Sequence, residues 1–294
     1  MAQAERRISY ARAVCEILRR ADVPLPFADV LAAVQAMPVR PVPQPARTVR
    51  NALRNSPLAI PVDNDRYAWV LWFLKGATVR HILSQRELDE ESLRLGPDAC
   101  YILFPFLYAP RHADARACYL YLEQGPLFSQ PIRPFDEGAA GIAPSPALGE
   151  WFRSMDCVAG DSLLFEVTDG EEGIYHVFLE PAGRQDAERV ARRNAQVAQA
   201  VRELLTRKRR PFPLFRLMPA LVSRRMYHDA CPPMPLEHIL RDAPAFALEN
   251  GKVRAIPDAA AADYRPDLSL QDREPPPRRA APKGIWQRLF GRRR

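Results

Sequence analysis

The sequence predicts an α+β protein in which two helix-rich segments flank a smaller β-rich centre. Three observations support this expectation. A helix-like segment near the N-terminus is repeated near the C-terminus, the residues between the copies form short apolar runs separated by Gly, Pro and Asp, and the net charge changes sign twice along the chain. The chain has 294 residues, 47% of them hydrophobic, which is enough for two or three domains with buried cores.

The repeat keeps a constant offset of 187 residues. ARAVCEILRR at 11–20 returns as AQAVRELLTR at 198–207. Four blocks align in the same order, the last with one residue deleted: 11–20, 24–34, 53–57 and 60–70 in the first copy, and 198–207, 211–221, 240–244 and 247–256 in the second. Chance similarity would not keep register across four blocks, so the sequence predicts a duplication of about 70 residues.

Each copy begins with two amphipathic helices. The buried stripe of the first helix is predicted to contain Ile8, Ala11, Val14, Cys15 and Leu18 in the first copy, and Ala198, Val201, Leu204 and Leu205 in the second. The second helix of the first copy has its own stripe, formed by Phe27, Val30, Leu31 and Val34. These spacings of three and four residues are typical of one helical face.

A short third helix and a hairpin complete the predicted module. PARTVRNALR at 45–54 has Pro45 in the first turn and ends at Asn55-Ser56-Pro57. The segment 58–74 is predicted to form two short strands around Asp63-Asn64-Asp65. Three helices followed by a hairpin make a winged helix-turn-helix, whose third helix can enter the major groove.

The first copy resembles the HARE-type winged helix of bacterial RNA polymerase delta subunits and chromatin-associated proteins. The resemblance covers roughly 5–73 and rests on ARAVCEILRR, PARTVRNALRNSP and the DRYAWV strand. It implies a nucleic-acid-binding or adaptor module without catalytic chemistry. The corresponding segment in the second copy is a diverged version of the same module.

The third helix of the first copy is the predicted DNA-binding site. The basic and amide side chains on its expected outer face recur at spacings of three and four, and a wing arginine accompanies them. The predicted set is Arg47, Thr48, Arg50, Asn51, Arg54 and Arg66. Arginine and asparagine can contact phosphates and read guanine or adenine edges, whereas the alternative is a solvated helix surface.

The second copy lacks this face. At the same offset Arg47 becomes Met234, Arg50 becomes Glu237 and Asn51 becomes His238. A glutamate is repelled by phosphate, so this third helix is predicted to be a poor duplex reader. The basic residues of this copy form a secondary patch elsewhere, which either tracks a phosphate backbone or satisfies a helix dipole: Arg207, Lys208, Arg209, Arg210, Arg224 and Arg225.

The centre is β-rich and acidic. Residues 81–183 carry a net charge of −11, against +6 before them, +8 in 184–256 and +4 in the tail. Strands are expected in ACYILFPFLYA, ACYLYLEQ, DSLLFEV and GIYHVFLEP. The segment 151–180, with Trp151 and Phe152 ahead of VAGDSLLF, resembles the last strands of the DNA-binding pseudobarrel of plant transcription factors and restriction-enzyme effector domains. Such barrels contact DNA through basic arms, and here only Arg111, His112 and Arg116 offer a basic patch. The centre is therefore either a spacer or protein-binding platform or a nucleic-acid contact.

The chain is predicted to divide into five segments. They are a winged helix (1–78), a helical connector (79–94), the acidic barrel (95–183), the second winged helix (184–257) and a disordered, basic, Pro-rich tail (258–294). In the connector Ser84 and Glu87 form a candidate capping box, and Arg80 and His81 at its head are expected on the surface. The tail ends in IWQRLFGRRR, which would either grip a polyanion or partner or remain solvated.

The sequence indicates no enzyme chemistry. It contains no Walker loop, GxGxxG, HExxH or GxSxG motif. Asp161 and Glu166 lack a nearby lysine for metal-nuclease chemistry, and Gly160-Asp161 has a simpler explanation as a turn. The spacing of Cys231 with His228 and His238 fits no standard zinc motif, so neither a metal nor a cofactor is predicted. The cysteines are expected to be reduced and mostly buried.

These features predict a non-enzymatic, cytoplasmic bacterial protein that binds double-stranded DNA, in a transcription- or chromatin-related role. Two alternatives share the same sequence features. One is a protein-interaction adaptor, with a protein partner on the acidic barrel. The other is an accessory specificity subunit for a separately encoded nuclease or DNA-modification enzyme. No secretory signal or membrane span is expected.

Overall fold

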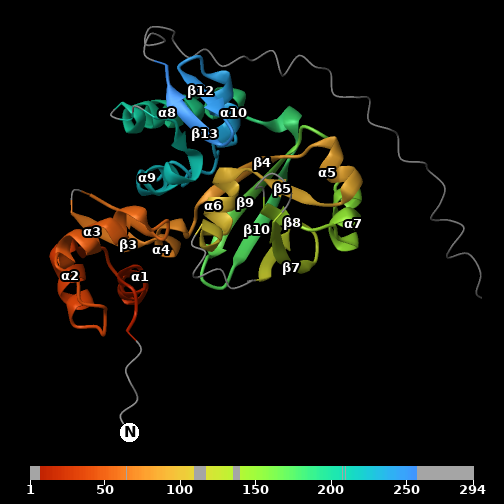
Figure 1. Ribbon diagram of the computed structural model, residues 1–294. Helices are drawn as coiled ribbons and strands as arrows, with labels where there is room; N and C mark the ends of the chain where they lie inside the picture. The colour runs from red at the N-terminus through yellow and green to blue at the C-terminus, as the bar shows by residue number, and fades with distance from the viewer. Residues whose placement is uncertain are drawn as a thin grey trace, which may run out of the picture. The chain divides into compact units, whose positions relative to one another are not determined.

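The computed structural model describes residues 7–63, 65–108, 117–134, 140–206, 208 and 210–256. These residues belong to one compact unit, Met1–Tyr264. The predicted tail, 258–294, lies outside the described residues, as do Arg111, His112 and Arg116. The described chain is a mixed α+β protein with three separate sheets (Figure 1).

The first copy contains three helices and a three-stranded antiparallel sheet of order β1-β3-β2. Its elements are α1 (Tyr10–Arg20), β1 (Leu25–Pro26), α2 (Phe27–Gln35), α3 (Pro45–Asn55), β2 (Ala59–Pro61) and β3 (Arg66–Trp69). Ser9 caps α1 by accepting a hydrogen bond from the Arg12 N–H at 3.3 Å. The predicted stripe of α1 is correct at Val14, Cys15 and Leu18, but Ala11 is exposed.

The second copy has the same order of elements and a sheet of order β11-β13-β12. It consists of α8 (Ala187–Leu205), β11 (Phe212–Pro213), a 3-10 turn η4 (Leu214–Arg216), α9 (Met218–Ser223), α10 (Leu236–Asp242), β12 (Phe246–Glu249) and β13 (Lys252–Ala255). Its α9 packs against β2 of the first copy and against α4 (Val70–Leu74).

The correspondence between the copies extends to individual side chains and strand registers. The pairs Val14 and Val201, Leu18 and Leu205, Val49 and Leu236, and Leu53 and Leu240 are each 187 residues apart and fully buried. The register pairs Leu25 with Tyr67 in one sheet and Phe212 with Val253 in the other, so the one-residue difference falls in the hairpin turn. The same interior positions therefore form the core of both copies.

The central sheet has seven strands in the order β4-β9-β10-β6-β7-β8-β5. The strands are β4 (Thr78–Ile82), β5 (Leu93–Leu95), β6 (Ala117–Leu122), β7 (Leu127–Pro134), β8 (Ala140–Ile142), β9 (Ser162–Asp169) and β10 (Ile174–Glu180). Only the β10 and β6 pair among these described strands is parallel. The helices and 3-10 turns beside them are α5 (Gln85–Glu90), α6 (Pro97–Leu103), η1 (Pro105–Tyr108), α7 (Pro146–Ser154) and η3 (Ala182–Arg184).

Three local expectations were wrong. ACYILFPFLYA, expected as a strand, forms α6 and η1, because Pro97 starts a helix and a short apolar run does not distinguish a buried helix from a strand. The hairpin strand ends at Trp69, after which VLWFL forms α4. The segment 79–94 is more than a connector, because it contributes β4 and β5 to the central sheet.

The presence of β4 in the central sheet also changes where two side chains lie. Arg80 and His81, expected on the surface, are buried within β4. The capping box of α5 is confirmed, since the Ser84 side chain accepts from the Glu87 N–H and Glu87 accepts from the Ser84 N–H.

Candidate nucleic-acid interface

Helix α3 is held in the first copy by its apolar face. Val49 and Leu53 are fully buried where α3 packs against α1 and α2. Pro45 occupies the first turn, where its missing N–H has no intrahelical partner to lose. The opposite side of α3 is therefore left to solvent.

The exposed side of α3 carries most of the predicted DNA-binding residues. Arg47, Arg50, Asn51 and Arg54 are all exposed and, at these spacings, lie along one face. Within the described part of the chain, no carboxylate forms an ion pair with the three arginines. Their positive charge is thus available to an external anion.

Arg50 and Thr48 are restrained by contacts within the first copy. The Arg50 guanidinium lies over the Phe27 ring, 4.4 Å from its centroid, which restrains the side chain on the α2 side of the face. Thr48 is half-buried, and its hydroxyl donates to the Gln44 carbonyl at 3.1 Å. Thr48 therefore supports the helix start and is not on the same exposed face as the arginines.

Arg66, at the start of β3, is exposed but paired. Its guanidinium lies 2.5 Å from the Asp63 carboxylate, and the hydrogen bond between them lowers the pKa of Asp63 and raises that of Arg66. The Asp63 carboxylate also accepts the Arg66 N–H at 3.2 Å, which fixes the turn. A phosphate would have to compete with Asp63 for this arginine.

Sequence reasoning missed both Phe27 and Asp63 as neighbours of the site. Phe27 was assigned only to the core, yet its ring also carries Arg50, and its N–H donates to the Asp65 carbonyl at 2.8 Å. This bond joins the start of α2 to the turn between β2 and β3. The position of Asp63 three residues before Arg66 was a usable signal for the ion pair.

The equivalent helix of the second copy, α10, is closed against the central sheet region. Met234, Glu237 and His238 are all half-buried. The Leu236 N–H at the start of α10 donates to Asp98 Oδ2 at 2.8 Å, and α10 packs on α6. The positions that are open on α3 thus form an internal contact here.

A pocket of about 260 Å³, open to solvent, lies beside this contact. Its ionisable lining residues are His81, Glu87, Arg94, Asp98, Glu237 and His238. Burial raises the pKa of Asp98 to about 6, although the Leu236 N–H partly offsets this effect. Burial opposes ionisation of Glu87 as well, but its bond with His81 and its other hydrogen bonds lower its pKa to about 2. Burial also lowers the pKa of His238, which favours its neutral form.

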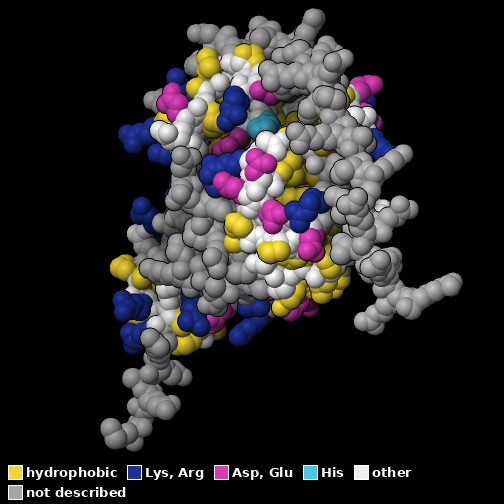
Figure 2. All heavy atoms as spheres, turned by 90° about the vertical axis from the view of Figure 1, so that its right-hand side faces the viewer, with side chains coloured by type: hydrophobic (Ala, Val, Ile, Leu, Met, Phe, Trp, Pro, Cys, Tyr) yellow, Lys and Arg dark blue, Asp and Glu magenta, His cyan; other side chains and the backbone are white. Residues whose placement is uncertain are grey.

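On the face of the molecule shown in Figure 2, acidic and basic side chains are interspersed among the described residues.

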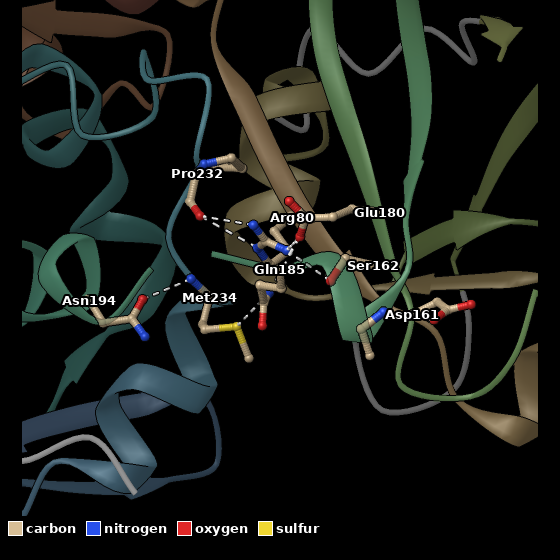
Figure 3. Close-up of polar contacts among 9 residues, drawn as sticks. Arg80, Asp161, Ser162, Glu180, Gln185, Asn194, Pro232 and Met234 are labelled. Atoms are coloured by element: carbon tan, nitrogen blue, oxygen red, sulfur yellow. Dashed lines mark hydrogen bonds and ion pairs between the residues drawn. The ribbon is translucent and has the colours of Figure 1, made fainter. Parts of the chain in front are cut away.

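A buried arginine fastens the second copy to the sheet. Arg80 on β4 donates to the Pro232 carbonyl at 3.4 Å, to Ser162 Oγ at 2.9 Å and to the Glu180 carboxylate (Figure 3). The segment after Pro232 is held from the other side, because Asn194 Oδ1 accepts the Met234 N–H at 2.9 Å. Removing the arginine would leave several of these groups without a partner.

The secondary basic patch is divided among different surroundings. Lys208 and Arg210 are exposed, while Arg207 and Arg209 lie outside the described residues. Arg224 pairs with Glu203 at 2.7 Å. Arg225 has a left-handed backbone, with φ of 55°, and its guanidinium lies 6.0 Å from the centre of the Phe73 ring. The described members therefore do not form one continuous free cationic surface.

The Gly160-Asp161 turn is structural. Asp161 accepts hydrogen bonds from the Val158 N–H at 3.0 Å and the Ala182 N–H at 2.9 Å, and Gly160 has a φ of 97°. Both carboxylate oxygens of Asp161 are used to hold the chain together.

No protein-family model matches this chain, and no curated protein matches it significantly. In the described part of the chain, none of the helices has the length and apolar character needed to cross a membrane.

Proposed function

We propose that this chain is a cytoplasmic, non-enzymatic DNA-binding protein whose first copy is a HARE-like winged helix and presents α3 to a duplex. Arg47, Arg50, Asn51 and Arg54 contact phosphates and base edges, and Arg66 on the wing contacts the backbone after leaving Asp63. The role is transcription- or chromatin-related.

The observation that carries the proposal is the free cationic face of α3. Its arginines are exposed and have no ion-pair partner among the described residues, whereas Val49 and Leu53 hold the helix from behind. Three arginines and one asparagine on one face can make charge-assisted, bidentate hydrogen bonds with phosphate oxygens.

In the same proposal the second copy is a diverged duplicate that has become structural. Glu237 and His238 replace the cationic residues, and the helix that bears them is packed on α6. The central sheet is a pseudobarrel-like domain that joins the two modules. Because this region is acidic, its surface repels phosphate groups and is unsuited to binding DNA.

The test compares duplex binding by the full chain and by Arg50→Glu/Arg54→Glu in fluorescence anisotropy over a range of salt concentrations. The double variant is expected to bind at least about 100-fold more weakly, and to reduce the slope of log affinity against log salt by about 2, because two phosphate contacts become repulsive. Circular dichroism checks that both proteins are folded.

A matched control separates a local effect from net charge. Arg184→Glu/Arg192→Glu makes the same charge change at exposed positions of η3 and α8. It should weaken binding by less than about fivefold, since these positions contact no DNA in the proposed arrangement. Equal losses in the two double variants, or no loss in the first, would exclude α3 as the binding element.

A further inference from the structure

One face of the central sheet exposes aromatic side chains that the proposed DNA-binding role does not use. Eight large hydrophobic residues are exposed in the described part of the chain, and four belong to this face. They are Tyr119 and Tyr121 on β6, Leu127 on β7 and Phe178 on β10. Their exposed fractions are 40%, 44%, 54% and 38%.

The strand register places these residues on the same side of the sheet. Tyr121 is opposite Leu127 on one neighbour and His176 on the other. His176 is in turn opposite Glu166 on β9. Residues directly opposite each other project to the same side, so one row crosses four strands from Glu166 to Leu127.

The rings are also in contact. The Tyr121 and His176 rings meet edge-on with centroids 5.2 Å apart, and the His176 and Phe178 centroids are 6.2 Å apart. Leu120 and Val177, which alternate with these residues, are buried on the other side of the sheet. The aromatic cluster is therefore a formed surface feature held by a packed core.

This sheet face is covered at the β4 end. Arg80, opposite Leu164, is buried and donates to the Pro232 carbonyl, and at the edge of the sheet the Thr78 N–H donates to the Tyr227 carbonyl at 2.7 Å. The second copy thus covers β4 and leaves the aromatic cluster uncovered on β10, β6 and the start of β7.

The charge around the cluster selects the chemistry of its partner. At the described outward positions of β6, β9, β10 and 127–130, the charged residues are Glu166, Glu180 and, opposite Ile174 beyond a bulge, Asp169. Glu180 pairs with Arg80. Residues 81–183 carry a net charge of −11. Such a surface repels phosphates, whereas tyrosine faces beside a carboxylate attract arginine and lysine.

We propose that this face, formed by Tyr119, Tyr121, Leu127, His176 and Phe178 with Glu166, binds a basic segment of a partner protein. Arginine or lysine side chains of the partner lie over the tyrosine rings and pair with Glu166. Aliphatic side chains between them cover Leu127 and Phe178. The site is separate from α3, so it can recruit a protein while the first copy holds DNA.

The test measures binding of a labelled peptide, in which Arg alternates with Leu, to the full chain by fluorescence anisotropy at physiological salt. Tyr119→Ala/Tyr121→Ala/Phe178→Ala should weaken binding at least about tenfold, because aromatic anchors dominate such contacts. Val23→Ala/Leu107→Ala, which also removes exposed apolar groups, should bind as the unaltered protein does. Glu166→Lys should weaken binding more than Glu150→Lys, an equal charge change at an exposed site on α7.

Four other results would each overturn the proposal. One is the absence of peptide binding to the unaltered chain, and another is equal binding by the triple variant and its control. Tyrosine-dependent binding of a single-stranded oligonucleotide in place of the peptide would identify a base-stacking surface. Concentration-dependent self-association that the triple variant abolishes would identify a contact between two copies of this chain. Duplex binding by the triple variant is measured in parallel and should be unchanged, so failure here is distinguishable from failure of the α3 proposal.

Discussion

The two copies share a core but differ in what their third helix faces. In the first copy Val49 and Leu53 are buried and the opposite side of α3 is open. In the second copy Leu236 and Leu240 occupy the same core positions, while Glu237 and His238 lie against the central sheet region. The core positions are apolar in both, and the outward positions differ with their surroundings.

This difference teaches that a repeated core does not preserve a repeated site. An interior position is constrained by volume and apolarity, which the first and second copies share. The residue type at an outward position is constrained only by the groups or solvent that its side chain contacts. On α3 that is solvent or an external anion, whereas on α10 it is the N-terminal end of α6, where Asp98 accepts the Leu236 N–H.

The largest expected effect concerns the shared core. Leu53→Ala and Leu240→Ala should each lower the free energy of unfolding by about 2–5 kcal/mol, since both remove a fully buried leucine from equivalent positions. Urea unfolding measures the stabilities, and anisotropy measures duplex binding under conditions where both variants are folded. Only Leu53→Ala should weaken binding. A near-zero cost at Leu240 would show that the two cores are not equivalent.

Next in size is the buried arginine that fastens the second copy. Arg80→Met removes the donors to Pro232, Ser162 and Glu180, and should cost roughly 3 kcal/mol, near the lower end for a broken buried pair because Glu180 retains some contact with water. Urea unfolding and amide exchange in α10 measure the loss.

The control for this variant is Arg224→Met, which breaks the more exposed pair with Glu203 and should leave stability unchanged. Faster exchange in α10 is expected only for the Arg80 variant. If both variants behave alike, Arg80 does not fasten the second copy.

Much of each copy could be predicted from the sequence, because local patterns determine it. Helical spacing indicated the buried faces, Pro45 marked the start of α3, and a deletion in the repeat matched the shorter hairpin turn. The exposure of Arg47, Arg50 and Arg54 followed from the same spacing, since these residues lie opposite Val49 and Leu53.

The contacts between segments could not be predicted in this way. Arg80 and His81 read as surface residues at the head of a connector, yet strand pairing of β4 with β9 buries them. Nothing local to Asp98 indicates that it meets Leu236, 138 residues later. The aromatic face likewise depends on which strands are neighbours, since Tyr121 and His176 are brought together only by the pairing of β6 with β10.

A pH dependence of intermediate size should report on the α6–α10 contact. The pKa of Asp98 is raised to about 6 from 3.8, so the folded chain binds this proton more tightly than the unfolded chain. The contribution of Asp98 to the free energy of unfolding should therefore rise as pH falls from 7 towards 4.5, by roughly 2 kcal/mol. Below pH 4.5 stability should decline, because the pKa of Glu87 is lowered to about 2 and its ionised form is progressively lost.

Asp98→Asn isolates this contribution, because asparagine can still accept the Leu236 N–H but cannot ionise. Unfolding curves at pH 7 and 5 should show that the gain on acidification is lost in the variant. The decline below pH 4.5 should remain. An unchanged gain would assign the effect to another group and remove Asp98 from the account of the α10 contact.

The smallest expected effect tests why α10, in the proposed arrangement, does not bind DNA. Glu237→Arg/His238→Asn gives α10 the residues found at Arg50 and Asn51. If chemistry alone separated the copies, this exchange would create a second duplex-binding face and strengthen binding markedly. We expect a change of less than about twofold, because the exchanged positions are half-buried beside α6, which hinders the approach of a duplex to this side of α10. Glu188→Arg on α8 is the matched control, since it raises the net charge by the same amount at an exposed position.

Equal anisotropy titrations for the two variants would mean that the packing of α10, more than the identity of its side chains, prevents the second copy from binding DNA. Clearly tighter binding by the α10 variant alone would mean that its face is accessible, and that the difference between the copies is only the loss of the cationic residues.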